Sequence, residues 1–172
     1  MLLSLAIETL YRPLWSDLIL GELEYHEALK LVERGEDQAP AEAKAARLVE
    51  QMRSVFADAL VENWEPHEGT FGLPDRNDEH VLAAAVVGGA GGIVTDNVKD
   101  FPKAEVPNHI RVIKPADFAA DTVATNPEIA LHAVRTISER FHNPPKSVDE
   151  LLTNLEKRYG MTEAVDLMRS VS

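Results

Sequence analysis

The sequence predicts an α/β fold, in which helices cover both faces of a mostly parallel sheet, followed by a helical appendage. Short apolar segments alternate with helical segments over residues 11–123, and this order is typical of a parallel sheet. After Asn126-Pro127 the chain keeps a helical period and shows no strand signal. We therefore expect one α/β domain at residues 1–124 and a helical extension at residues 125–172.

The elements of the α/β domain follow from local patterns. The expected helices span residues 2–10, 17–34, 40–56, 79–87 and 115–123, and the expected strands span residues 11–15, 59–64, 93–95 and 110–113. Ser16 is a good N-cap for the helix that begins at Asp17. Asn77 or Asp78 is the expected cap of the 79–87 helix, whose alanines permit close packing on a sheet. The glycines at 88, 89, 91 and 92 end that helix in a tight turn.

The extension is expected to form three helices. The first runs from about residue 128 to 141 and is broken by Pro144-Pro145. The second opens with Ser147-Val148-Asp149-Glu150, which fits the capping-box pattern. The third begins near Thr162.

Composition excludes several classes of function. The formal net charge of −12 argues against non-specific adhesion to nucleic acid or an anionic membrane, although a metal ion can still bridge carboxylates and phosphate. The absence of cysteine excludes disulfides, zinc-thiolate sites and cysteine nucleophiles, and a reducing cytoplasm is the expected location. No apolar run approaches the roughly 18–20 residues that span a bilayer. The apolar start Met1–Ile7 is interpreted as a buried helix and not as a signal peptide.

Carboxylates gather at two places that an α/β fold brings to one edge. Asp75 and Asp78 stand at the start of the 79–87 helix, and Asp96 and Asp100 follow the 93–95 strand. Helix N-termini and strand C-termini are where α/β folds gather ligands. Magnesium and manganese prefer carboxylate oxygens. The sequence therefore predicts a divalent-cation site; helix capping and turn formation are the alternative roles of these aspartates.

Glu22 is the candidate that capping does not explain. Its helix carries Leu18, Tyr25 and Leu29 on the same side, so Glu22 lies on or beside the apolar stripe. A carboxylate in such a place is costly unless it is paired or bound to a cation. Glu22, Asp78 and a residue between 96 and 100 are thus candidate ligands for metal-assisted hydrolysis of a phosphodiester.

Other polar residues lie beside these clusters. Ser16 and Thr95 are candidates to bind a ligand or a carboxylate, although Thr95 also suits a plain strand position. Arg76 and Lys99 are candidates for a basic rim that contacts nucleic acid, with ordinary solvated charges as the alternative. His80 is interpreted as a surface histidine, with contact to a substrate phosphate as the alternative.

Three segments of the chain, 16–23, 75–85 and 93–101, resemble PIN-domain ribonucleases and are similar to the VapC-type toxins of bacterial toxin–antitoxin pairs. The resemblance covers nearly the whole chain, and the tail after Pro127 is similar to the C-terminal extension of one PIN subgroup. It implies a three-layer α/β/α fold and cleavage of RNA that depends on Mg²⁺ or Mn²⁺. It also implies inhibition by a cognate antitoxin protein, and frequent homodimers.

The resemblance also implies roles for individual residues. Glu22 matches the family's acid on the second helix, and Asp78 matches the acid at the start of the alanine-rich helix. The fourth family acid falls on Asn97, so Asp96 or Asp100 substitutes for it, or Asn97 binds metal through its amide oxygen or through water. The family begins with a strand that ends in an aspartate, and this chain starts at the helix that follows. We therefore expect the first strand and the first metal acid to be absent.

These expectations lead to a functional prediction with alternatives. We predict a metal-dependent endoribonuclease that is the toxin of a type II toxin–antitoxin pair. The alternative is a catalytically inactive PIN-like binding module or a truncated fragment that lacks the first metal-binding aspartate. A metal-dependent phosphatase or DNA nuclease would share the chemistry of the site and differ in substrate.

Overall fold

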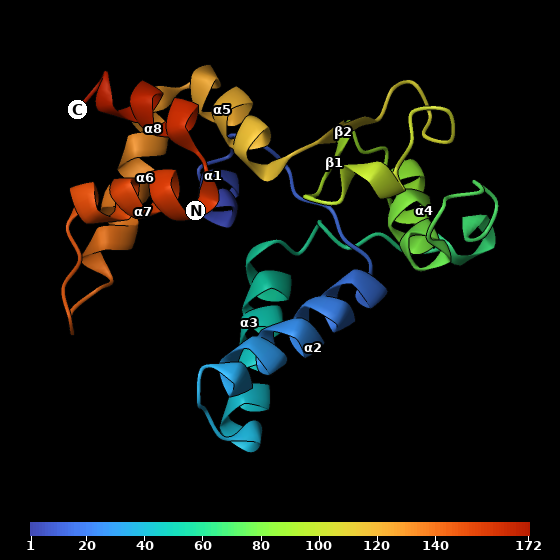
Figure 1. The fold of residues 1–172 in the computed structure, drawn as a ribbon, viewed down its shortest axis with the longest axis horizontal. Helices are drawn as coiled ribbons and strands as arrows, with labels where there is room; N and C mark the ends of the chain where they lie inside the picture. The colour runs from blue at the N-terminus through green and yellow to red at the C-terminus, as the bar shows by residue number, and fades with distance from the viewer. The chain divides into compact units, whose positions relative to one another are not determined.

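The computed structural model describes all residues from Met1 to Ser172 (Figure 1). Contacts divide the chain into two compact units. The helical unit comprises residues 1–12, 94–98 and 112–172, and the central unit comprises residues 13–93 and 99–111. This division by contacts does not test whether residues 1–124 and residues 125–172 fold independently. The predicted domain boundary between residues 124 and 125 therefore stays a prediction.

The helical unit contains five helices. They are α1 (Leu2–Ile7), α5 (Pro115–Thr125), α6 (Pro127–Glu139), α7 (Val148–Tyr159) and α8 (Thr162–Arg169). The predicted capping box of α7 is confirmed: the Ser147 hydroxyl accepts the Glu150 N–H at 3.2 Å, and the Glu150 carboxylate accepts the Ser147 N–H at 2.7 Å. Gly160 ends α7 in the left-handed region, with φ of 66°, which a residue with a side chain rarely adopts.

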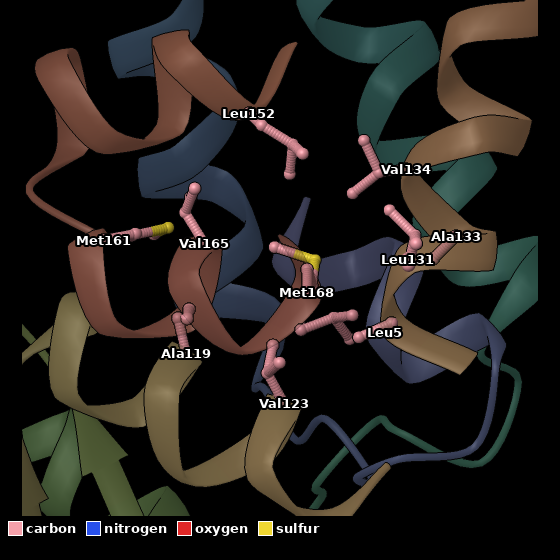
Figure 2. Packing of buried hydrophobic residues seen from close by; sticks show 12 residues of the cluster. Leu5, Ala119, Val123, Leu131, Ala133, Val134, Leu152, Met161, Val165 and Met168 are labelled. Atoms are coloured by element: carbon pink, nitrogen blue, oxygen red, sulfur yellow. The ribbon is translucent and has the colours of Figure 1, made fainter. Parts of the chain in front are cut away.

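The core of the helical unit joins the start of the chain to its end. Leu5 of α1 is fully buried and belongs to the same apolar cluster as Val123 of α5 and Met168 of α8 (Figure 2). Leu131 and Leu152 bring α6 and α7 into the cluster. Burial at this level stabilises each large aliphatic side chain by about 1.5–3 kcal/mol. The first helix is therefore part of the core that the C-terminal helices share.

The central unit begins with the helical hairpin of α2 (Asp17–Glu33) and α3 (Gln38–Val55) (Figure 1). Ser16 caps α2 as predicted, because its hydroxyl accepts the Ile19 N–H at 3.2 Å. The expected burial of the apolar stripe on α2 is wrong: Leu18, Tyr25 and Leu29 are 42%, 63% and 42% exposed. The helix buries Leu20 instead. No helix of the protein is both long and apolar enough to cross a membrane.

Helix α4 (Glu79–Val87) follows a single 3₁₀ turn at Arg76–Asp78 and carries three of the unit's six buried alanines. Ala83 and Ala84 pack against Trp64. The helix ends at Gly88, where a Cβ atom would lie 2.8 Å from Cγ2 of Val61. The absence of a side chain at this position therefore lets the helix end lie against the segment that contains Val61.

Two short strands pair in parallel. They are β1 (Gly92–Val94) and β2 (Arg111–Ile113). The Arg111 N–H donates to the Gly91 carbonyl, and the Thr95 N–H donates to the Ile113 carbonyl, each at 3.0 Å. The first bond joins the starts of the two strands and the second joins their ends, so the strands run in the same direction and the pairing is parallel. The predicted combination of parallel pairing with a helical C-terminal region is confirmed.

The strands expected at residues 11–15 and 59–64 are wrong as full strands. Trp15 and Leu60 form an isolated parallel bridge, with Trp15 bonding to the backbone of Ala59 and Val61 at 3.0 and 2.8 Å. Pro13 has no N–H to donate before Trp15, and the helix cap Ser16 follows directly after it. The ladder therefore has no room to extend in either direction.

Candidate functional site

Asp78 is the residue around which the candidate site is built. It stands at the N-cap position of α4, yet its side chain makes no capping hydrogen bond. Its Oδ2 atom is buried and has no hydrogen-bond partner. A buried carboxylate oxygen without a partner costs free energy unless a ligand satisfies it. Asp78 therefore occupies the predicted cap position without capping the helix through its side chain, and its carboxylate is available to a ligand.

Asp75 lies one turn earlier and does have a local structural role. Its Oδ1 atom accepts the Asn77 N–H at 2.9 Å, which caps the short 3₁₀ turn that leads to Asp78. The alternative role proposed for these aspartates, capping, is therefore the one that Asp75 performs.

Like charges surround Asp78. Burial raises the pKa of Asp78 most, and the nearby carboxylates of Asp75 and Asp100 raise this pKa further. His80 lowers it, and Glu22 raises it by the smallest amount. The structure therefore brings three other predicted acidic residues, Glu22 of α2, Asp75 before the 3₁₀ turn and Asp100 after β1, within electrostatic reach of Asp78. A bound cation would relieve this repulsion.

Glu22 reaches the cluster from α2 and contacts a buried histidine. The Glu22 side chain is 49% exposed, and its Oε1 atom lies 3.3 Å from Nε2 of His80. The His80 side chain is only 4% exposed, and its ring lies 6.0 Å from that of Trp64. The interpretation of His80 as a surface histidine is therefore wrong. A histidine in the first turn of an alanine-rich helix gives little sequence signal of which way its ring points.

Glu79 is a buried acid that sequence reasoning missed. It is 2% exposed, and its carboxylate accepts the backbone N–H groups of Phe71 and Leu73 at 3.1 and 2.8 Å. Burial by itself would raise the pKa of Glu79, but the backbone donors outweigh it and lower the pKa below its ordinary value. Glu79 thereby fixes the loop that leads into the 3₁₀ turn before Asp78. The sequence signal was the glycine-rich loop that precedes the helix, since such a loop presents N–H groups.

The other predicted site residues have the following places. Ser16, the N-cap of α2, is fully buried, and Arg76 is exposed at the start of the 3₁₀ turn that ends at Asp78. Lys99 is exposed in the turn that contains Asp100. These three belong to the central unit together with Glu22 and Asp78.

Thr95, Asp96 and Asn97 belong to the helical unit. Asp96 and Asn97 are exposed, and the Thr95 hydroxyl accepts the Asn97 N–H at 3.0 Å. This bond forms a small turn directly after β1. The roles expected for these three residues stay predictions.

The donor chemistry of the cluster fits a hard divalent cation. Its members offer carboxylate oxygens, which magnesium and manganese prefer, and one of those oxygens is buried without a partner. No group of three or more histidine, aspartate or glutamate side chains is arranged closely enough to hold a metal ion. Asp100 and Glu22 both raise the pKa of Asp78, and none of these three carboxylates is engaged in the capping bond that Asp75 makes.

Comparison with known proteins places the chain in a family. The family model described as the PIN domain matches residues 1–99. The chain belongs to the PIN domain family. A second model, described as the VapC50 C-terminal domain, matches residues 115–170, which include α5 to α8. The resemblance seen in the sequence is thereby confirmed for both parts of the chain.

A curated relative matches part of this PIN domain protein. It is "Putative ribonuclease VapC50" from Mycobacterium tuberculosis (strain ATCC 25618 / H37Rv), which is 37% identical over 79 residues. These residues are 45% of this chain and 47% of that protein, so the match spans about half the length of the relative. No solved structure matches the chain.

Proposed function

We propose that this PIN domain protein is a metal-dependent endoribonuclease and the toxin of a type II toxin–antitoxin pair. One observation carries the catalytic part of the proposal, namely the buried, partnerless Oδ2 atom of Asp78 inside a group of carboxylates that raise its pKa. Repulsion between carboxylates in the folded protein lowers its stability, and such destabilising arrangements are common in active sites. The curated relative, whose printed name describes a ribonuclease, supports RNA as the substrate.

The acidic residues would hold the metal. We assign Glu22 and Asp78 as ligands, with Asp100 of the same unit completing the set. Metal binding by Asp96 or Asn97 stays a prediction from the sequence. Bound Mg²⁺ or Mn²⁺ would supply Lewis-acid chemistry, which acidifies water and stabilises negative charge on a phosphodiester. The chain itself holds Glu22 of α2 within electrostatic reach of Asp78 at the N-cap of α4 and keeps Asp78 partly shielded from water.

Neighbouring residues would receive the RNA. Arg76 and Lys99 are exposed beside the acids, where their positive charges would offset the repulsion between phosphate and a chain of net charge −12. Ser16 of the same unit is a further proposed substrate contact, and the contact expected for Thr95 stays a prediction from the sequence. The VapC likeness supports an antitoxin protein as the partner. A homodimer as the form of the toxin is a further part of the proposal, which the resemblance in the sequence implies.

Cleavage of RNA by the purified chain tests this proposal. We expect wild-type protein to cleave a structured RNA in the presence of Mg²⁺ or Mn²⁺ and to stop when EDTA is added. Asp78→Ala should lower the rate by at least about a hundredfold, because it removes a proposed metal ligand. Asp37→Ala is the matched control, because Asp37 is an exposed acid that begins α3 without a side-chain capping bond.

The outcomes separate the functional classes. Equal cleavage by wild type and Asp78→Ala would show that the activity arises elsewhere. Folded wild-type protein that cleaves neither RNA nor DNA but binds an antitoxin would identify a non-catalytic PIN module. Cleavage of DNA in preference to RNA would correct the substrate and leave the metal site in place.

A further inference from the structure

The His80 side chain is a buried group that the proposed reaction does not use. It projects from the first turn of α4, two residues after Asp78, and it is 4% exposed. Its ring lies beside that of Trp64, which belongs to the apolar cluster with Ala83 and Ala84. Packing on that side restricts the imidazole to a narrow range of positions.

The two nitrogens of this ring have different surroundings. Nδ1 is buried and has no hydrogen-bond partner, whereas Nε2 lies 3.3 Å from Oε1 of Glu22. A neutral imidazole carries one N–H and one acceptor nitrogen. A buried N–H without an acceptor is costly, so the proton is favoured on Nε2, where it faces the carboxylate of Glu22.

Glu22 needs such a partner if it is to act at a defined place. It is a long, half-exposed side chain on a helix, and it loses rotamer freedom when it is held in one position. A contact to a rigid, buried ring restricts it before any ligand arrives. Substitution of a residue that hydrogen-bonds to a metal ligand and orients it commonly lowers metal affinity by about 10–100-fold.

We infer that His80 is a positioning residue that holds the Glu22 carboxylate of α2 near Asp78 at the N-cap of α4, so that the two acids can act on one divalent cation. This inference rests on the proposed metal site and adds the residue that assembles it. The competing role is that of a core residue whose loss affects folding alone.

A double-mutant cycle on Mn²⁺ affinity, measured by calorimetry on the full chain, separates the two roles. We expect His80→Leu to weaken Mn²⁺ binding about tenfold. In the Glu22→Ala background the same change should alter the affinity by less than about twofold, because the partner that His80 holds is gone. His80→Gln keeps an N–H donor and should restore the affinity to within about threefold of wild type. Circular dichroism confirms that each variant is folded.

A measurement on the unsubstituted histidine covers the case in which His80 variants do not fold. In ¹H–¹⁵N spectra of the metal-free chain, Glu22→Ala should shift the ring signals of His80 and leave those of the exposed His67 unchanged. Unchanged His80 signals would overturn the inference. An equal loss of affinity from His80→Leu with and without Glu22, or no loss at all, would also overturn it.

The Asp78→Ala variant distinguishes this inference from the proposed function. If Asp78→Ala abolishes Mn²⁺ binding while His80→Leu leaves it intact, only the role of His80 is wrong. If Asp78→Ala binds Mn²⁺ like wild type, the proposed metal site itself is wrong, and the inference falls with it.

Discussion

Two aspartates three residues apart have different tasks in this protein. Asp75 uses its carboxylate to cap a turn, whereas Asp78 keeps a buried oxygen without a partner. The residue type is the same and the local sequence favours capping at both positions. The difference arises because Asp78 lies at the start of α4, where α2 brings Glu22 into contact with His80 of α4. A contact of this kind depends on tertiary structure, so local sequence patterns do not predict it.

The raised pKa of Asp78 predicts that removing its charge stabilises the protein. A carboxyl with a raised pKa contributes stability in its protonated form, and this contribution is lost as the pH rises through the folded-state pKa. In EDTA at pH 7 we therefore expect Asp78→Asn to increase the free energy of unfolding by about 0.5–2 kcal/mol. Urea unfolding measures it, and Asp37→Asn on the surface should change little. A loss of stability in Asp78→Asn would show that its charge is satisfied in the protein.

Glu79 predicts the opposite dependence on pH. Its lowered pKa means that its contribution to stability is present above the ordinary glutamate value and is lost as the pH falls through the folded-state pKa. We expect Glu79→Gln to cost about 1.5–3 kcal/mol at pH 7, because the backbone donors of Phe71 and Leu73 lose a charged acceptor. The cost should shrink in acid.

Urea unfolding between pH 3 and 7 measures this dependence. Glu68→Gln, an exposed change in the loop just before the one that Glu79 fixes, is the control. A cost for Glu79→Gln that stays constant with pH would show that the charge of Glu79 does not stabilise the fold.

At the scale of elements, the helices and the two paired strands were predicted well, whereas the strands expected at residues 11–15 and 59–64 form only a single bridge. The Ser16 cap and the Ser147 capping box act within one turn, so sequence patterns predicted the starts of α2 and α7. The bridge between Trp15 and Leu60 joins residues far apart in the chain, and its length is limited by Pro13. The prediction of which face of α2 is buried was also wrong, because hydrophobic spacing does not reveal which face a partner helix covers.

The end of α4 provides a test of close packing between elements. A Cβ atom at Gly88 would lie 2.8 Å from Cγ2 of Val61, 3.0 Å from the Ala84 carbonyl oxygen and 3.2 Å from Cδ1 of Leu14. Val61 is β-branched and Ala84 contributes backbone, so neither moves easily. We expect Gly88→Ala to lower the free energy of unfolding by about 1–3 kcal/mol.

Thermal unfolding and urea unfolding both report this change. Gly91→Ala, three residues later in the same glycine turn, is the matched control, because a Cβ atom there would have no neighbour within 4 Å. Equal effects of the two substitutions would mean that chain flexibility, and not the contact with Val61, sets the cost.

At the scale of the whole molecule, the first helix belongs with the last four. Leu5 is fully buried in the cluster formed with α5 to α8, although more than a hundred residues separate it from them in the sequence (Figure 2). The sequence predicted that residues 2–10 are helical and buried, but it carried no signal of the partner. A pattern of apolar spacing identifies a face that needs cover, and the contact that covers it is set by the fold.

Substitution of Leu5 tests whether the helical unit behaves as one cooperative unit. Leu5→Ala should destabilise it by about 2–5 kcal/mol, because it removes a fully buried side chain from a closely packed cluster. Hydrogen exchange followed by mass spectrometry should show faster exchange in α5 to α8, while the α2–α3 hairpin in the central unit keeps its protection. Ile7→Ala, at an exposed position on the same helix, should leave both unchanged. A loss of exchange protection that is confined to one unit requires that this unit open independently of the other. Faster exchange throughout the chain would therefore show that the two compact units unfold together.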